Sequence, residues 1–140
     1  MNIYILSTII LIVGCAQTQE VAKTFWGSST RALEEARKDA IKKTFDCEFQ
    51  KCFDAVLHLT QAPVTDEEKT YQLFLKNRKK KVIVLMYIPG SVDTTEVGVF
   101  FESPQNNKTT IEISSLSSNA KMTAADYIFK SLEKQCLGSP

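Results

Sequence analysis

The chain has 140 residues, a length that suits one folded domain behind an apolar leader. Its 17 lysines and arginines nearly balance 16 aspartates and glutamates, so no global field draws the protein to nucleic acid. Hydrophobic residues make up 44% and aromatic residues 9%, which excludes a disordered tail and predicts a packed core.

The chain begins with an uncharged apolar segment that ends in Gly14 and Cys15. The run from Ile3 to Val13 fits the roughly 7 to 15 apolar residues of a signal peptide and is shorter than the about 20 that span a bilayer. An aliphatic residue three positions before a cysteine, with a small residue just before it, is typical of bacterial lipoprotein signals. The pattern predicts lipidation of Cys15. The usual basic start is absent, and an ordinary cleaved secretory signal or an uncleaved anchor are the alternatives.

We therefore expect residues 1–14 to be the signal peptide, 15–28 the lipidated cysteine and its tether, and 29–136 a single domain. Ala16 lacks the aspartate that favours inner-membrane retention in many diderm bacteria. The expected location is the cell envelope, facing the periplasm, with the outer membrane slightly favoured over the inner.

Phe25 and Trp26 lie between the tether and the domain. Exposed aromatic pairs are frequent anchors at interfaces, so this pair is a candidate contact for an envelope partner. Packing against the domain is the favoured alternative.

Good helix formers predict a helix from Thr30 to Asp39. Its apolar stripe of Leu33, Ala36 and Ala40 is narrow, so we expect a surface helix that touches the domain lightly. Residues 40–47 fit either a continuation of this helix or a strand, and alternation of apolar and polar residues favours the strand.

The clearest helical pattern covers residues 48–59, and a second helix is predicted at 121–135. Strands are predicted at 71–76, 81–88, 96–102 and 109–115. The run 81–88 is apolar at successive positions, which indicates that both of its faces are covered. Polar turns are expected at 77–80 and 103–107. The predicted fold class is α+β: an antiparallel sheet of four to five strands packed by two main helices, with an additional N-terminal helix.

The cysteines allow little cross-linking. If Cys15 carries lipid, Cys47, Cys52 and Cys136 remain, and they can form at most one internal disulfide. Cys47 and Cys52 are expected to lie beyond disulfide reach, a bridge from either to Cys136 is open, and buried thiols that fill the core are favoured. The single histidine, His58, is expected to be a packing residue, because a helix would turn it away from Cys52. No metal or cofactor is expected.

One charge cluster supports a functional hypothesis, and it lies around the turn at 77–80. Its members are Lys76, Arg78, Lys79, Lys80 and Lys81. Such a cluster can meet anionic lipid, a polyanionic envelope polymer or an acidic protein surface. A solvated hairpin tip is the favoured alternative.

Two groups of polar residues near the last strands bear on catalysis. They are the serines Ser114, Ser115, Ser117 and Ser118 and the carboxylates Glu96, Glu102 and Glu112. One histidine and no nucleophile elbow argue against a serine hydrolase. Positions on a half-solvated strand explain the carboxylates better than an acid–base pair. We expect a protein that is not an enzyme.

Four segments resemble a family of small bacterial lipoproteins of uncharacterised function: residues 27–34, 52–57, 93–101 and 111–118. The resemblance implies an envelope location and a compact α+β domain, broadly similar to helix-on-sheet domains of outer-membrane assembly lipoproteins. It carries no active site to any residue here. The expected function is a membrane-anchored, non-enzymatic binding or scaffolding protein. The alternatives are a subunit of an envelope assembly or transport complex and a secreted enzyme with an unrecognised site.

Overall fold

The computed structural model describes residues 30–61, 71–87 and 95–137. The chain divides into two units, 1–31 and 32–140, and the second contains the folded domain. The predicted signal peptide and tether, with Cys15, Phe25 and Trp26, lie outside the described residues. Helical residues at 30–35 lead into the elements η1 (Ala36–Asp39), β1 (Ile41–Phe45), α2 (Phe49–Leu59), β2 (Tyr71–Asn77), β3 (Val82–Tyr87), β4 (Glu96–Gln105), β5 (Lys108–Ser115) and α3 (Ser118–Leu137).

The five strands form one antiparallel sheet in the order β1-β5-β4-β3-β2. Its register brings Ile41 beside Ile113, Ile113 beside Val99, and Val99 beside Ile83. Residues directly opposite one another in a sheet point to the same face, so this row crosses four strands as one apolar surface. The predicted α+β class and antiparallel sheet are confirmed.

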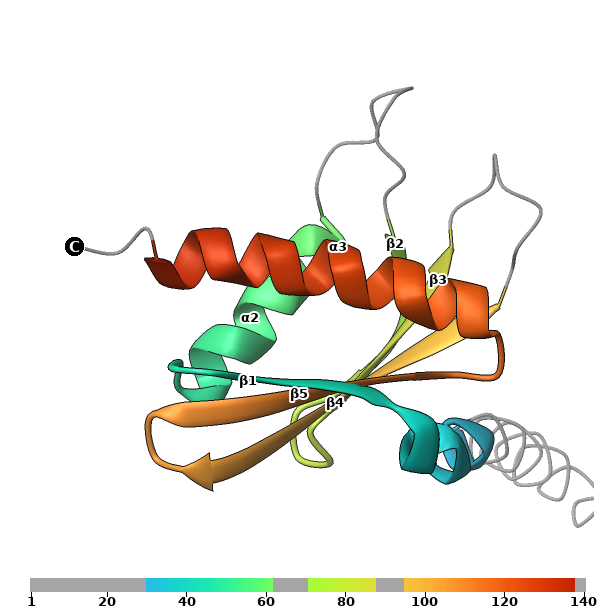
Figure 1. Cartoon of the computed structure of the whole chain (residues 1–140), viewed down its shortest axis with the longest axis horizontal. Coiled ribbons are helices and arrows are strands. Elements are labelled where there is room, and N and C mark those ends of the chain that lie inside the picture. Colours follow the sequence, from blue (N-terminus) through green and yellow to red (C-terminus); the bar gives the residue numbers. More distant parts are fainter. Residues whose placement is uncertain (1–29, 62–70, 88–94, 138–140) are drawn as a thin grey trace, which may run out of the picture. The chain divides into compact units, whose positions relative to one another are not determined.

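Helices α2 and α3 cover that apolar surface, and Figure 1 shows both on the same side of the sheet. Phe53 of α2 is 1% exposed and packs against Phe49 and Phe101 with ring centroids 5.4 and 5.1 Å away. Helix α3 contributes Ile128 and Leu132, which are almost fully buried. Both helices were predicted.

Helix α3 is longer at both ends than the predicted 121–135. It starts earlier because Ser117 acts as its N-terminal cap: the Ala120 amide donates to the Ser117 hydroxyl over 3.2 Å. Ser117 thereby has a structural role at the beginning of the helix.

Part of the other face of the sheet is also buried, where the segment 32–39 packs on it. Leu33 is 2% exposed and packs with Val82, Val84 and Phe100. The helix lies on the surface as expected, with Arg31, Glu34 and Glu35 exposed, but its contact with the domain is not light, because Leu33 is buried in this second core. The expectation that both faces of β3 are covered is confirmed, since Ile83 belongs to the core beneath the two long helices.

Two hairpins connect the strands β2–β3 and β4–β5. The first turns at 78–81, close to the predicted position, and Lys81 adopts a left-handed φ of 54° there. The predicted turn at 103–107 is wrong, because Gln105 pairs with Lys108 and the turn is only Asn106 and Asn107. A register shift between Glu102 and Gln105 interrupts the regular pairing around Pro104, which lacks an amide hydrogen to donate.

Candidate functional site

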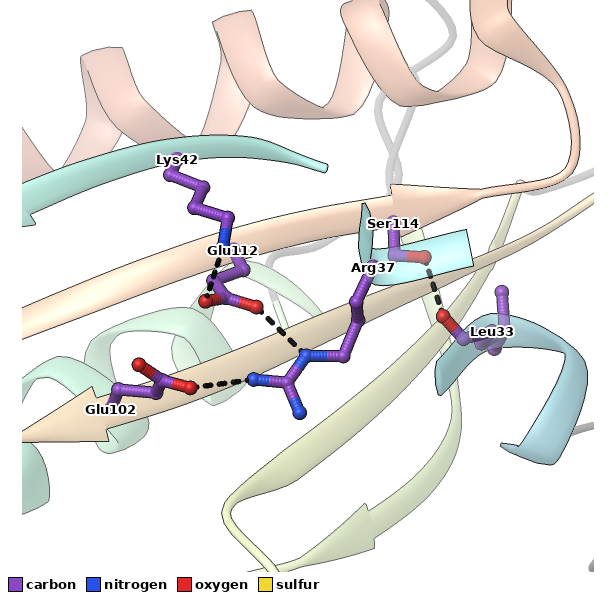
Figure 2. Close-up of polar contacts among 6 residues, drawn as sticks. All are labelled: Leu33, Arg37, Lys42, Glu102, Glu112 and Ser114. Carbon is purple, nitrogen blue, oxygen red and sulfur yellow. Dashed lines mark hydrogen bonds and ion pairs between the residues drawn. The ribbon is translucent and has the colours of Figure 1, made fainter. Parts of the chain in front are cut away.

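A buried carboxylate lies at the centre of the second face of the sheet (Figure 2). Glu112 is in the middle of β5, and its side chain is 3% exposed. Arg37 Nε donates to its Oε2 over 2.7 Å, and Lys42 Nζ lies 3.0 Å from its Oε1. A second nitrogen of Arg37 binds the exposed Glu102 at 2.8 Å. Both oxygens of the buried carboxylate are therefore paired with cations.

Strand register and the turn of η1 create this network. Glu112 lies between Lys42 on β1 and Phe100 on β4. The guanidinium carbon of Arg37 lies 4.6 Å from the centroid of the Phe100 ring, so the arginine stacks on the ring while it reaches both glutamates. The network thus binds η1 to β4 and β5.

The charge balance keeps Glu112 ionised. Burial alone would raise the pKa of Glu112, but the hydrogen bonds and charges of Arg37 and Lys42 outweigh it and hold the pKa below its ordinary value. The sequence-based assignment of Glu112 to a half-solvated strand position is wrong, because the segment 32–39 covers it. A carboxylate held ionised by two cations suits a structural ion network better than proton transfer.

The serines beside this network bind backbone carbonyls. Ser114 is fully buried and donates its hydroxyl hydrogen to the Leu33 carbonyl over 2.6 Å (Figure 2). Ser115 donates to the Glu96 carbonyl over 2.8 Å. Both hydroxyls are engaged in joining segments of the fold.

The basic cluster predicted at the β2–β3 turn divides into two parts. Arg78 binds Asp54 of α2 at 2.6 Å and stacks on Phe53, with its guanidinium carbon 4.4 Å from the ring centroid. Lys81 lies over the Phe49 ring at 5.1 Å. These two cations dock the turn onto α2.

Lys76, Lys79 and Lys80 are exposed, and no ion pair involving them occurs among the described residues. The predicted contact with an anionic surface therefore stays a prediction for these three lysines. The structure assigns a packing role to Arg78 and Lys81, which the sequence pattern alone did not distinguish from their neighbours.

The three cysteines of the domain gather at one end of the helix layer. Cys47 precedes α2, Cys52 lies in α2 and Cys136 lies in the last turn of α3, and all three are free thiols. The expectation of buried thiols is correct for Cys52 and wrong for Cys47 and Cys136, which are half-buried. His58 is exposed on α2, so its expected packing role is wrong as well.

Cys47 and Cys136 line a hollow of about 340 Å³ together with Asp46, Glu48 and Lys51. Within the described ranges, no three or more histidine, cysteine, aspartate or glutamate side chains are arranged to hold a metal ion. None of the described helices combines the length and hydropathy that a bilayer-spanning segment requires.

The fold and its two cores define an α+β domain with two helices on one face of an antiparallel sheet. No family model and no curated protein matches the chain. Among solved structures, the domain is similar to the solution structure of the Aha1 dimer from Colwellia psychrerythraea, with a TM-score of 0.50 and 9% sequence identity. The similarity covers 69% of this chain and 93% of that chain. At this identity it supports the fold alone.

Proposed function

We propose that the protein is a lipid-anchored component of the bacterial cell envelope whose folded domain is a non-enzymatic binding or scaffolding module. The observation that carries the proposal is the leader, in which the apolar run from Ile3 to Val13 is followed by Gly14 and Cys15. Such a run is suited to export and too short to span a bilayer well. The domain then works within reach of a membrane, with the outer membrane slightly favoured over the inner.

The polar interior of the domain supports the non-enzymatic part of the proposal. Glu112 is the best-placed carboxylate for acid–base chemistry, but Arg37 and Lys42 occupy both of its oxygens. The buried hydroxyl of Ser114 donates to a backbone carbonyl. These groups stabilise the attachment of the segment 32–39, as expected of a scaffold.

The surface supports the binding part of the proposal. Leu116, just before α3, is 73% exposed, and Met122 in its first turns is 63% exposed. Leu116 borders a shallow hollow that Ala32 and Ala36 also line. Exposed apolar side chains beside a hollow can contact a partner protein.

The test of anchoring is metabolic labelling with a palmitate analogue in a diderm bacterial host, followed by separation of membrane and soluble fractions. We expect the wild-type chain to be labelled and to sediment with membranes. Cys15→Ser should lose both properties, because the thiol that accepts the lipid is gone. Cys47→Ser is the matched control and should keep them. Equal labelling of wild type and Cys15→Ser would contradict the proposal.

Crosslinking in intact cells tests how the anchored domain works. A binding or scaffolding module should give crosslinks that depend on Leu116 and Met122 and that weaken when both become serine. An obligate subunit of an assembly complex should instead lose stability when its partner is absent. The crosslinked proteins from wild type and Cys15→Ser, compared by mass spectrometry, show whether anchoring is needed for the contact.

A further inference from the structure

Cys47 and Cys136 line the same hollow. Cys47 also lies near enough to Cys52 and Cys136 to help raise the pKa of both thiols. The backbone of Cys47 is held in place, because the Thr109 hydroxyl donates to its carbonyl over 2.7 Å. Cys47 and Cys136, far apart in the sequence, are therefore neighbours at a fixed place in the fold.

The three thiols differ in access to solvent. Cys52 is 0% exposed, so a reagent cannot reach it in the folded protein. Cys47 and Cys136 are half-buried and line the same hollow of about 340 Å³. A small disulfide can thus reach Cys47 and Cys136 without unfolding the domain.

We propose that Cys47 and Cys136 form a reversible disulfide that ties the connection before α2 to the last turn of α3, while Cys52 remains a thiol. A bond between Cys47 and Cys52 is disfavoured because Cys52 is 0% exposed and burial raises the pKa of its thiol, which leaves little thiolate to attack Cys47. The proposal concerns the folded domain and does not depend on lipidation of Cys15.

The reaction is thiol–disulfide exchange with a small-molecule disulfide as the oxidant. The thiolate of Cys47 attacks one sulfur of the small disulfide, which forms a mixed disulfide and releases one small thiolate. The thiolate of Cys136 then attacks the Cys47 sulfur and releases the second small thiolate. The protein pair loses two protons and two electrons, and the small disulfide is reduced to two thiols.

Burial and neighbouring groups disfavour Cys52 and Cys136 as the first attacker. Burial and the nearby Cys47 raise the pKa of Cys52 well above its ordinary value. Burial, Cys47 and Asp46 together raise the pKa of Cys136. Since the thiolate is the nucleophile, Cys52 stays unreactive and Cys136 acts second, on a sulfur that is already beside it.

The test uses the full chain with Cys15→Ser, purified in mild detergent, so that only the three thiols of the domain remain. The protein is incubated with oxidised glutathione, free thiols are counted with a maleimide, and crosslinked peptides are mapped by mass spectrometry. We expect the free thiols to fall from three to one, with a Cys47–Cys136 peptide and an unmodified Cys52. Dithiothreitol should restore all three.

Two further variants, on the same Cys15→Ser background, sharpen the result. Cys52→Ala should still form the bond, whereas Cys136→Ala should not. Oxidation should raise the Tm by several degrees in the parent chain and in Cys52→Ala and leave Cys136→Ala unchanged, because the bond closes a long loop. If Cys52→Ala does not fold, peptide mapping of the parent chain still shows which two cysteines are bonded. A Cys47–Cys52 peptide, crosslinks only between two copies, or three thiols that stay free would overturn the proposal.

Discussion

Glu112→Gln is the sharpest perturbation of the second core. The change keeps the shape of the side chain and removes the charge that two cations bind. Breaking a buried ion pair from one side costs roughly 3 to 5 kcal/mol when the remaining charge stays buried. Arg37 and Lys42 are 31% and 52% exposed, so water partly compensates them. We therefore expect a loss of about 2 to 3 kcal/mol in the free energy of unfolding at pH 7.

Glu102→Gln is the matched control. Glu102 binds the same arginine, but its side chain is 57% exposed, so its loss should cost about 0.5 kcal/mol or less. Urea denaturation followed by circular dichroism measures both values. Equal losses for the two variants, or a loss below about 0.5 kcal/mol for Glu112→Gln, would refute the claim that the buried carboxylate holds η1 onto the sheet.

The difference in stability between wild type and Glu112→Gln should depend on pH, and the depressed pKa of Glu112 fixes the direction. The folded-state pKa of Glu112 is depressed, so its contribution is fully present above the unfolded pKa of about 4.3. That contribution is lost as pH falls through the lower folded-state pKa. The stability difference between wild type and Glu112→Gln should shrink in acid, and a difference that grows below pH 4 would contradict the ionised assignment.

Two further substitutions, one in each core, and an exposed control test the packing by urea denaturation. Leu132→Ala removes a side chain that is 0% exposed and should lower the free energy of unfolding by about 2 to 5 kcal/mol. Leu116→Ala is the control, because Leu116 is 73% exposed, and it should change that free energy by about 0.5 kcal/mol or less. Equal effects of the two variants would contradict the assigned core. Gly98→Ala places a Cβ 2.7 Å from Phe100 Cε2 and 3.4 Å from Leu33 Cβ, so we expect a loss of about 1 to 3 kcal/mol, and a stabilised variant would show that the second core has spare room.

Local pattern predicted most of the elements. The apolar spacing of residues 49–59 reflects a single buried helix face, and the continuous run of β3 reflects a strand covered on both sides. Both features depend on neighbours in sequence, which periodicity reports directly. The turn after β4 was misplaced because Pro104 was interpreted as a turn residue, whereas a bulge accommodates it within the strand.

The buried polar network was not predictable from local pattern. Glu112 lies between two isoleucines on β5, and the same alternation is typical of a strand with one solvent-exposed face. The difference is made by Leu33 and Arg37, which come from a distant segment and cover that face. The meeting of Cys47 with Cys136 is likewise a tertiary event, set by how α3 lies over β1 and α2.

The mass of the N-terminal peptide of the protein isolated from bacterial membranes tests the lipid anchor most directly. We expect a mature chain that begins at Cys15 and carries lipid on its sulfur, with residues 1–14 removed. A chain that begins at another residue, or a Cys15 recovered as an unmodified thiol, would contradict it.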